Sequence, residues 1–312
     1  MSRIVIALGG NALQEPGKPA TAEAELSIVD QTCEQIVESI RLGNEVVLTH
    51  GNGPQVGRLI LQNEYGAALT PAMPFDVCGA MSQGMIGYHL VQGMARAMRL
   101  YGVKRQAVAL VTQVRVNGLD PGFANPTKPV GPFYTQKEAQ RLIAERGYAM
   151  KEDAGRGWRR VVASPEPLEI VELDAVRTLV EKGFIVVAAG GGGVPVVLDA
   201  DGDLNGIAAV IDKDLAGERL AEGLDADTLL MLTAVEEVYL HFGTPSQQAL
   251  HRITQEQARR YIGEGHFAAG SMLPKMEAAL RFASSKPGRR AIITAPLCAS
   301  RALCGEAGTI IA

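Results

Sequence analysis

The sequence contains few cysteines, and their spacing matches neither a disulfide framework nor a zinc site. The four residues, Cys33, Cys78, Cys298 and Cys304, form no Cys-x-x-Cys pair, and only the last two lie near each other. Disulfide-stabilised small domains and structural zinc sites need more closely grouped cysteines. The cysteines therefore argue against both classes of protein.

The sequence also lacks an excess of basic residues. It has 30 lysines and arginines against 34 aspartates and glutamates, which gives a formal net charge of −4. Proteins that bind nucleic acid usually carry a basic excess or a dense basic stripe. We therefore expect no nucleic-acid partner, and any phosphate binding must come from a few local lysines.

Long apolar runs are missing as well, since none reaches the roughly 18 residues that a membrane-spanning helix needs. Met1 leads directly into the strand-like run Ile4 to Leu8, without the basic and apolar segments of a signal peptide. We therefore expect a cytoplasmic protein with no membrane partner.

The composition that remains is typical of a folded enzyme, with 47% apolar and 21% charged residues. A length of 312 residues allows one large α/β domain or two smaller ones. Apolar runs of strand length recur along the chain, at Ile4 to Leu8, Val46 to Thr49, Ala107 to Thr112, Phe184 to Ala189, Thr228 to Leu232 and Ala291 to Thr294.

Helix-like segments separate most of these runs. The segment Glu25 to Leu42 places apolar residues on one face at spacings of three and four, as an amphipathic crossover helix does. Strands that are apolar throughout and alternate with such helices form parallel sheets covered on both faces. We therefore predict an α/β fold, a three-layer αβα sandwich around a mainly parallel sheet, in a single domain of residues 1–312.

One segment, residues 117–167, interrupts this alternation because it is rich in proline, glycine and charge. We predict that it forms an inserted, protruding subdomain. Its basic residues, Lys151, Arg156, Arg159 and Arg160, are either a solvated charged face or part of a lid over an anionic substrate. Composition alone favours the solvated face.

Glycine-rich turns follow three of the predicted strands. They contain Gly9, Gly10 and Asn11, then Gly51, Asn52 and Gly53, and finally Gly190, Gly191 and Gly192 within a run of four glycines. At the carboxyl edge of a parallel sheet, glycines let a phosphate approach backbone N–H groups. Either of the first two turns alone is better explained as an ordinary tight turn, but two turns that each hold an asparagine favour an anion site.

The known phosphate-binding signatures of other folds are absent. Neither Gly-x-Gly-x-x-Gly at a first turn after a strand nor Gly-x-x-x-x-Gly-Lys-Ser/Thr occurs. The chain therefore has neither a Rossmann fingerprint nor a P-loop, and its phosphate site must be of another type.

Three lysines stand in unusual contexts: Lys128 between two prolines, Lys213 between Asp212 and Asp214, and Lys275 after Pro274. An isolated lysine is usually a solvated surface charge. Phosphoryl transfer, however, mainly needs positive groups aimed at the transferring oxygens, so positioned lysines are chemically sufficient.

These motifs occur in the order IVIALGGNAL, THGNGPQVG, DVCGAMSQGMIGY, NPTKPVGPF, KEDAGRGWRRVVASPEP, GGGGVPVV, AVIDKDLA and GHFAAGSMLPKMEAA. Together they resemble the carbamate kinases of the amino-acid-kinase superfamily over essentially the whole chain. NPTKPVGPF, EDAGRGWR and AVIDKDLA are more specific to carbamate kinases than to relatives acting on acetylglutamate, aspartate or UMP.

The resemblance implies reversible phosphoryl transfer between ATP and carbamate, giving ADP and carbamoyl phosphate, often run toward ATP. It also implies Mg²⁺ bound through the nucleotide phosphates, since the sequence has no compact carboxylate cluster, and a homodimer. It identifies Lys128, Lys213, Asp214 and Lys275 as catalytic residues. The glycines and asparagines of the three turns would bind substrate and phosphate. The nucleotide would contact Asp212, Lys213, Ala234, Val238, Tyr239, Met272, Pro274 and Lys275.

Some residues have a competing explanation or depart from the family. His50 is interpreted as structural, because a carbamate oxygen is already anionic and needs no base. An apolar stripe of Met81, Met85, Ile86, Leu90 and Met94 is predicted to be core, with part of its helix facing a second subunit. Relatives commonly have an acidic residue where this chain has Ala208. This difference puts the fine tuning of the site in doubt, but not the reaction.

Two other functions compete with this interpretation. One is a kinase of the same fold that phosphorylates another small acid. The other is a nucleotide-binding regulatory or storage protein without turnover. The presence of all three lysines and Asp214 argues against the second function, because binding alone does not need the whole charge set.

Overall fold

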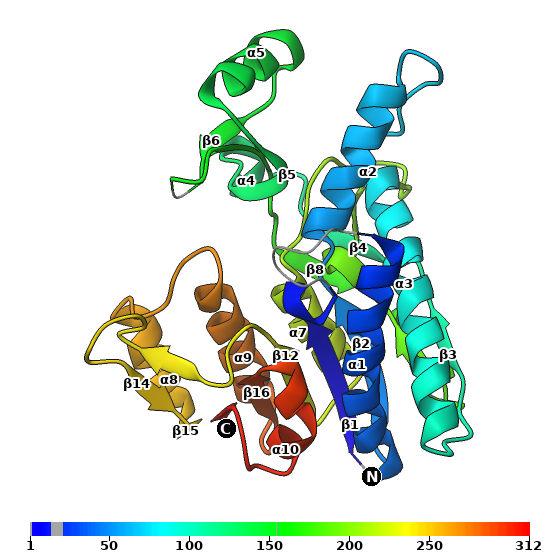
Figure 1. Cartoon of the computed structure of the whole chain (residues 1–312), viewed down its shortest axis with the longest axis vertical. Coiled ribbons are helices and arrows are strands. Elements are labelled where there is room, and N and C mark those ends of the chain that lie inside the picture. The colour runs from blue at the N-terminus through cyan, green and yellow to red at the C-terminus, as the bar shows by residue number, and fades with distance from the viewer. Residues whose placement is uncertain (1, 14–20, 154) are drawn as a thin grey trace.

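The computed structural model describes residues 2–13, 21–153 and 155–312. The side chain of Asn11, a predicted phosphate ligand, lies outside this description. The three layers of the fold and a protruding upper part are visible in Figure 1.

All six predicted strands lie in one eight-stranded sheet with the order β15-β17-β16-β12-β1-β2-β9-β3. The strands are β1 (Arg3–Leu8), β2 (Glu45–His50), β3 (Ala107–Ala109), β9 (Ile185–Val187), β12 (Thr228–Leu232), β15 (Arg252–Ile253), β16 (Arg290–Thr294) and β17 (Thr309–Ile311). Every pairing is parallel except that of β16 with β17. The prediction of a mainly parallel sheet is therefore confirmed.

Helices cover both faces of this sheet. Along β1, Ile4, Ile6 and Leu8 pack into one apolar cluster, whereas Val5 and Ala7 pack into the other. The first cluster includes side chains of α1 (Ala22–Arg41), α3 (Phe75–Leu100) and α10 (Ala299–Leu303), and the second includes those of α6 (Leu173–Glu181), α7 (Lys213–Gly223), α8 (Gln255–Gly263) and α9 (Met272–Ser285). Because alternate residues of one strand meet different helix layers, β1 is apolar throughout.

The predicted crossover helix is α1, which begins slightly earlier than the apolar periodicity suggested. The Thr21 side chain accepts a hydrogen bond from the Ala24 N–H at 3.2 Å and caps the helix there. The apolar stripe on α3 divides, since Ile86, Leu90 and Met94 are fully buried while Met81 is 41% exposed.

A second sheet, with the order β11-β10-β4-β8, lies outside the strands that the sequence predicted. It consists of β4 (Gln113–Val116), β8 (Pro167–Ile170), β10 (Val194–Leu198) and β11 (Leu204–Gly206). A hairpin of β13 (Val238–Leu240) and β14 (Gln248–Leu250) forms a separate two-stranded sheet, and its residues Val238, Leu240 and Leu250 pack into the same apolar cluster as α7 and α9. Short 3₁₀ turns, η1 (Gly10–Ala12), η2 (Gly190–Gly192) and η3 (Pro296–Cys298), connect strands to the following segments.

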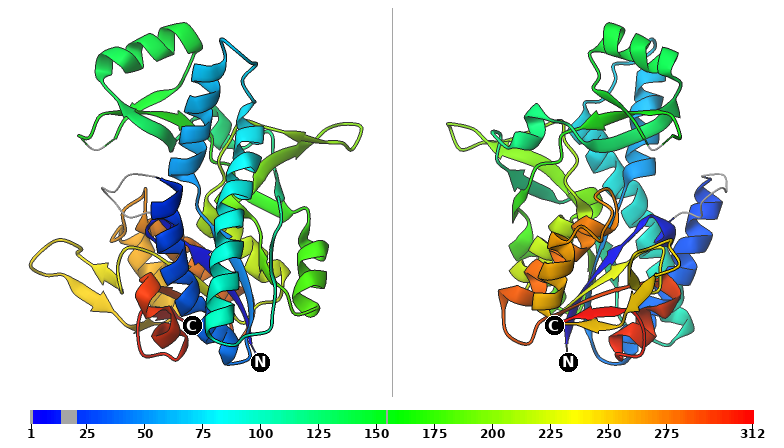
Figure 2. Two further views of the ribbon diagram at one scale, coloured as in Figure 1. Left: turned by 45° about the vertical axis from the view of Figure 1, so that its right-hand side comes forward. Right: turned by 90° about the vertical axis from the view of Figure 1, so that its left-hand side faces the viewer.

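Residues between β4 and β8 form the part of the molecule that protrudes. They contain α4 (Pro121–Ala124), β5 (Lys128–Tyr134), α5 (Gln136–Arg146), β6 (Met150–Glu152) and β7 (Trp158–Val162). The strands make an antiparallel sheet of their own, β5-β7-β6. Figure 2 shows that this insert stands beside α2 (Gly53–Gly66), beyond the carboxyl ends of the central strands.

The structure gives one further constraint on the helices. Among the helices of the described ranges, none combines the length and apolar character needed to span a membrane.

Candidate active site

A cavity of about 290 Å³ lies between the carboxyl edge of the central sheet and the insert. Predicted site residues line it, namely Gly10, Gly51, Asn52, Gly53, Lys128, Gly191, Asp212, Lys213, Asp214 and Lys275. The residues Leu13, Pro54, Gln55, Pro129, Val130, Val210, Ile211, Gly270 and Ser271 complete its wall. Six separate segments of the sequence therefore meet at one place.

The carboxylate of Asp214 holds two of the three lysines. Its Oδ1 accepts a hydrogen bond from Lys213 Nζ at 2.6 Å, and its Oδ2 accepts one from Lys275 Nζ at 2.9 Å. Burial alone would disfavour the charge of this carboxylate, but the two ammonium groups outweigh burial and lower the pKa of Asp214 to about 2. Asp214 is therefore ionised at neutral pH and fixes both cations from α7 and α9.

Lys213 carries its charge in a poorly hydrated place. Burial lowers the pKa of its ammonium group, and the Asp214 carboxylate opposes that shift. A cation that has lost most of its water needs little reorganisation to stabilise an anion, so its effect on a transferring phosphoryl group is large.

The third lysine, Lys128, reaches the core from the insert. Its Nζ donates to Asp212 Oδ2 at 2.6 Å. The other oxygen of Asp212 accepts from the Asp214 N–H at 2.8 Å and caps α7. With three lysines and two aspartates in its wall, the cavity has an excess of one positive charge and suits an anionic ligand.

Some of the glycines that were predicted to bind phosphate do not line this cavity. A Cβ at Gly9 would lie 2.4 Å from the Leu232 carbonyl oxygen, and one at Gly192 would lie 2.3 Å from that of Ile211. Gly190 faces His50, whose Nε2 would be 2.2 Å from an added Cβ. These three glycines therefore serve close packing, and only Gly191 of the third turn reaches the cavity wall.

His50 lies behind the glycine turns and not in the cavity wall. Burial lowers the pKa of His50 to about 4, so the ring is neutral at neutral pH. Its Nδ1 donates to the Gly51 carbonyl oxygen at 2.9 Å. These contacts agree with a structural role for this histidine.

A second cavity, of about 250 Å³, adjoins the first and shares Ser271 with it. Its wall is mostly apolar and is formed by Thr233, Ala234, Val235, Tyr239, Phe242, His266, Phe267, Ala268, Ser271 and Met272. Ala234, Tyr239 and Met272 were predicted to contact a nucleotide. Val238 and Pro274 were predicted as well, but neither lines the cavity, and the Val238 side chain is fully buried in the core.

Several residues of the two walls were missed from the sequence. Phe242, His266 and Phe267 belong to no phosphate-type motif, although GHFAAGSMLPK carries two of them. Gln55 could have been found, since it follows Gly53 and Pro54 in the second glycine turn. Ala208, the departure from the family pattern, is exposed and lines neither cavity.

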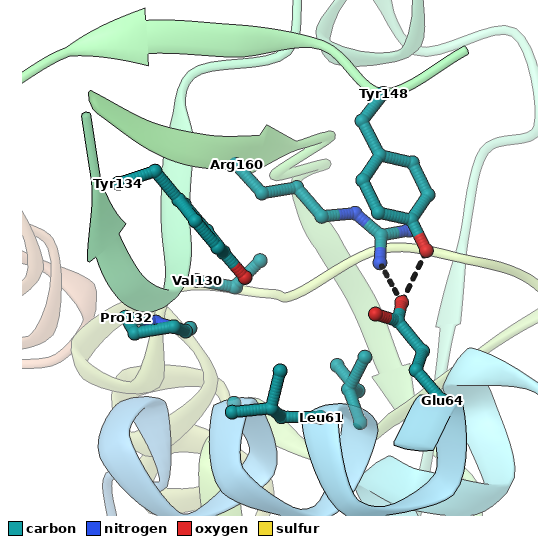
Figure 3. Close-up of a pocket in the computed structure, with 10 residues that line it drawn as sticks. Leu61, Glu64, Val130, Pro132, Tyr134, Tyr148 and Arg160 are labelled. Atoms are coloured by element: carbon teal, nitrogen blue, oxygen red, sulfur yellow. Dashed lines mark hydrogen bonds and ion pairs between the residues drawn. The ribbon is translucent and has the colours of Figure 1, made fainter. Parts of the chain in front are cut away.

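The insert is attached to α2 by a contact that we call the Glu64 cluster, formed by Glu64, Arg146, Tyr148 and Arg160. The Glu64 carboxylate accepts a hydrogen bond from the Tyr148 hydroxyl and pairs with Arg160 at 3.6 Å and Arg146 at 3.2 Å. Figure 3 shows Arg160 lying against the Tyr148 ring, with its guanidinium carbon 3.8 Å from the ring centroid. The adjoining space is only about 20 Å³, which suits a water molecule and no substrate.

A close backbone approach supports the same contact about two turns nearer the start of α2. A Cβ at Gly57 would lie 2.5 Å from the Gly131 Cα, so α2 and β5 touch where both residues lack a side chain. Gly131 has a φ of +73°, which favours glycine at this bend of β5. The insert, and Lys128 at the start of β5, are thus positioned from α2.

We expect Glu64→Gln to loosen the insert while leaving the core intact. The variant keeps the size of the side chain but loses both ion pairs, which lie partly exposed and together contribute about 1 kcal/mol. Hydrogen exchange should accelerate in residues 128–162 and not in β1 or β12. Glu145→Gln on the exposed face of α5 is the matched control, and unchanged exchange in the insert of Glu64→Gln would contradict this role of the cluster.

Comparison with known proteins agrees with this geometry. A model of the Amino acid kinase family matches residues 2–295. The chain therefore belongs to the amino acid kinase family, as its fold and its glycine- and lysine-lined cavity indicate. Within that family it is similar to carbamate kinases, among them those of Clostridium perfringens, at 51% identity over 99% of both chains, and Pyrococcus furiosus, at 52% over 98% of both.

Solved structures give the same result. The carbamate kinase of Giardia lamblia bound to AMP-PNP has a TM-score of 0.93 and 42% identity, covering 99% of this chain and 98% of that one. The resemblance to carbamate kinases noted in the sequence is thereby confirmed.

Proposed function

We propose that this chain catalyses phosphoryl transfer between ATP and carbamate, giving ADP and carbamoyl phosphate. The observation that supports it best is the meeting of Lys128, Lys213 and Lys275 in one cavity next to an apolar cavity large enough for a nucleobase. Relatives named as carbamate kinases share about half of its residues over the full length.

We propose that the two cavities divide the substrates between them. The nucleobase occupies the apolar cavity beside Tyr239 and Met272, and the phosphates extend past Ser271 toward Lys213 and Lys275. The carbamoyl group lies between the glycine turns and Lys128. Because the carbamate oxygen is already anionic, transfer needs positioned positive charge and no general base.

The ion pairs in the cavity also affect how Mg²⁺ could be bound. Both cavity carboxylates already hold lysines, Asp214 through two contacts and Asp212 through one. Within the described residues, no group of three or more His, Cys, Asp or Glu side chains could hold a metal ion. We therefore propose that Mg²⁺ enters with the nucleotide, bound by phosphate oxygens and water, and supplies further positive charge to the transferring group.

We further propose that the insert, residues 117–167, acts as a lid. Lys128 stands at the start of β5, and its ion pair with Asp212 crosses from the insert to α7. Closure of the insert would bring the third ammonium group to the transferring phosphoryl group. The direction of net reaction proposed for the enzyme is toward ATP, since carbamoyl phosphate is a reactive mixed anhydride.

The experiment that tests this function follows phosphorus by NMR in a mixture of protein, Mg-ATP and carbamate formed from ammonium and bicarbonate. A carbamoyl phosphate signal should grow together with that of ADP. Acetate or acetylglutamate in place of carbamate should give no acyl phosphate. An acyl phosphate formed from one of these acids, and not from carbamate, would instead favour another kinase of the same fold.

We also propose that the protein is a homodimer through the outer face of α3. Val77, Met81 and Tyr88 recur on this face and are 36%, 41% and 60% exposed. Large apolar side chains repeated at helical spacing on the outside of a long helix are typical of subunit interfaces.

We expect Met81→Glu to dissociate this dimer. In a two-fold interface each substitution occurs twice, so two carboxylates would be buried together. Sedimentation should give twice the 33.1 kDa of one chain for the wild type and one chain for the variant. Leu69→Glu, at a residue that is 94% exposed beyond α2, is the control and should remain dimeric. A dimeric Met81→Glu variant would exclude this face.

A further inference from the structure

Asn52 occupies the N-cap position of α2 but does not cap the helix. An asparagine at this position usually accepts a hydrogen bond from a backbone N–H two or three residues later. The Asn52 side chain makes no such bond. It is nevertheless buried, with 7% exposure, and it lines the cavity of about 290 Å³. The Asn52 side chain must therefore be held by something other than its own helix.

Ser82 of α3 holds the Asn52 amide. The Ser82 hydroxyl donates its single proton to the Gly79 carbonyl oxygen at 2.6 Å. Its oxygen is then left to accept a hydrogen bond, and it does so from Asn52 Nδ2 at 2.8 Å. The direction of the Ser82 hydroxyl thus decides which end of the amide faces α3, and that end is the NH₂ group.

Gly191 leaves room for the amide at this position because it has no side chain. A Cβ at Gly191 would lie 2.2 Å from Asn52 Nδ2 and 2.8 Å from its Oδ1. The amide therefore lies flat against the third glycine turn. Its Oδ1 accepts no hydrogen bond from any residue of the described ranges and is not fully buried, so it remains accessible in the cavity wall.

A free carbonyl oxygen is unexpected in an anion site. The sequence predicted an anion site at this turn, which an amide N–H would suit, but the structure uses an N–H of the Asn52 amide on Ser82. Most other groups of the wall are donors suited to oxyanions, such as the three lysines and the N–H groups of the glycine turns. An acceptor among them fits the part of the substrate that is itself a donor.

We propose that the Asn52 carbonyl oxygen accepts a hydrogen bond from the substrate's carbamoyl NH₂ group, and that Ser82 is the positioning residue that fixes this orientation. The inference rests on the proposed function, because it concerns how the same site selects its acyl group. A carbamoyl group and an acetyl group have nearly the same shape, so packing alone discriminates poorly between them. A hydrogen-bond acceptor discriminates because only the carbamoyl group can satisfy it.

The test compares carbamoyl phosphate with acetyl phosphate as phosphoryl donor to ADP, in the wild type and in Ser82→Ala. We expect the ratio of the two kcat/KM values to fall about tenfold in Ser82→Ala, the size of one neutral hydrogen bond. The Kd for ADP and the Tm should stay close to those of the wild type. If acetyl phosphate turnover is undetectable, its inhibition constant against carbamoyl phosphate replaces the kcat/KM value.

Ser39→Ala is the matched control, because Ser39 is also buried and also accepts a hydrogen bond from an asparagine, Asn44, but lies in α1 away from the cavity. Ser39→Ala should leave the ratio unchanged. Ser82→Cys, which keeps a weak acceptor of similar shape, provides a second measurement should Ser82→Ala unfold, and its ratio should fall by less than tenfold.

The outcomes separate the inference from the function on which it rests. Wild-type protein that makes no ATP from carbamoyl phosphate would overturn the proposed function itself. With an active wild type, an unchanged ratio in both Ser82 variants would overturn the role of Ser82. Equal losses with both donors would also overturn it, because that pattern belongs to a merely structural serine.

Discussion

Replacing Lys213 by alanine is expected to lower kcat by at least 10²-fold, with the fold preserved. Loss of one preorganised charge from a water-poor site typically costs about 3 kcal/mol in the transition state. Lys213 meets this description, because burial lowers its pKa and the Asp214 carboxylate fixes its ammonium group. Steady-state formation of ATP from carbamoyl phosphate and ADP measures the loss, and thermal unfolding checks the fold.

The matched control for this variant is Lys182→Ala. Lys182 is an exposed lysine next to the amino end of β9, at the edge of the sheet opposite the cavity. It should retain wild-type kcat. Asp214 keeps its bond to Lys275 when Lys213 is removed, so the core of α7 should stay folded. A folded Lys213→Ala variant with near-normal turnover would remove Lys213 from the mechanism.

Replacing Lys128 by alanine should lower kcat on the order of 10²-fold while ADP binding changes little. Pro129 and the start of β5 restrict the backbone at this lysine, so its ammonium group is presented without a large ordering cost. A contact that forms mainly with the transferring phosphoryl group strengthens in the transition state and therefore affects kcat more than nucleotide affinity. Kinetics with carbamoyl phosphate, together with calorimetric ADP binding, measures both quantities.

Lys151→Ala is the control for Lys128, because Lys151 is an exposed lysine of the same insert whose ammonium group donates to Asn125 Oδ1 at 3.3 Å and does not line the cavity. It should behave as the wild type. Two results would exclude a lid lysine: equal losses of kcat and ADP affinity in Lys128→Ala, or no loss in either.

Most of the central sheet could be predicted from the sequence because its strands are buried on both faces. Such strands are continuous apolar runs, and this signal does not depend on their neighbours. The second sheet could not be predicted in the same way. Its strand β4 is the short Gln113–Val116, and β10 directly follows the glycine run, so neither forms an isolated apolar run.

The sequence predicted the candidate site best where the functional residues are adjacent in the chain. Asp212, Lys213 and Asp214 lie in one motif, and the structure brings Lys128 and Lys275 to them through ion pairs. The role of each glycine could not be predicted from the sequence. A glycine that makes room for a ligand cannot be distinguished there from one that makes room for a neighbouring side chain. Gly190 and Gly192 are explained only by His50 and Ile211, which lie in other segments.

The orientation of Asn52 shows the same limit of sequence reasoning in polar groups. The sequence places an asparagine in a glycine turn, which is compatible with a donor or an acceptor facing the ligand. Ser82, thirty residues away, decides between them through its own bond to Gly79. The apolar cavity likewise combines Phe242 of one segment with Phe267 of another, and no spacing rule joins them.

The measurement that tests the central claim most directly is the rate of ATP formation by the wild-type protein from ADP, Mg²⁺ and carbamoyl phosphate, set beside the rate with acetyl phosphate. We expect rapid, protein-dependent ATP formation from carbamoyl phosphate and a much lower rate from acetyl phosphate. No ATP from carbamoyl phosphate, or equal rates from the two donors, would contradict the assignment of this cavity to phosphoryl transfer between carbamoyl phosphate and ADP.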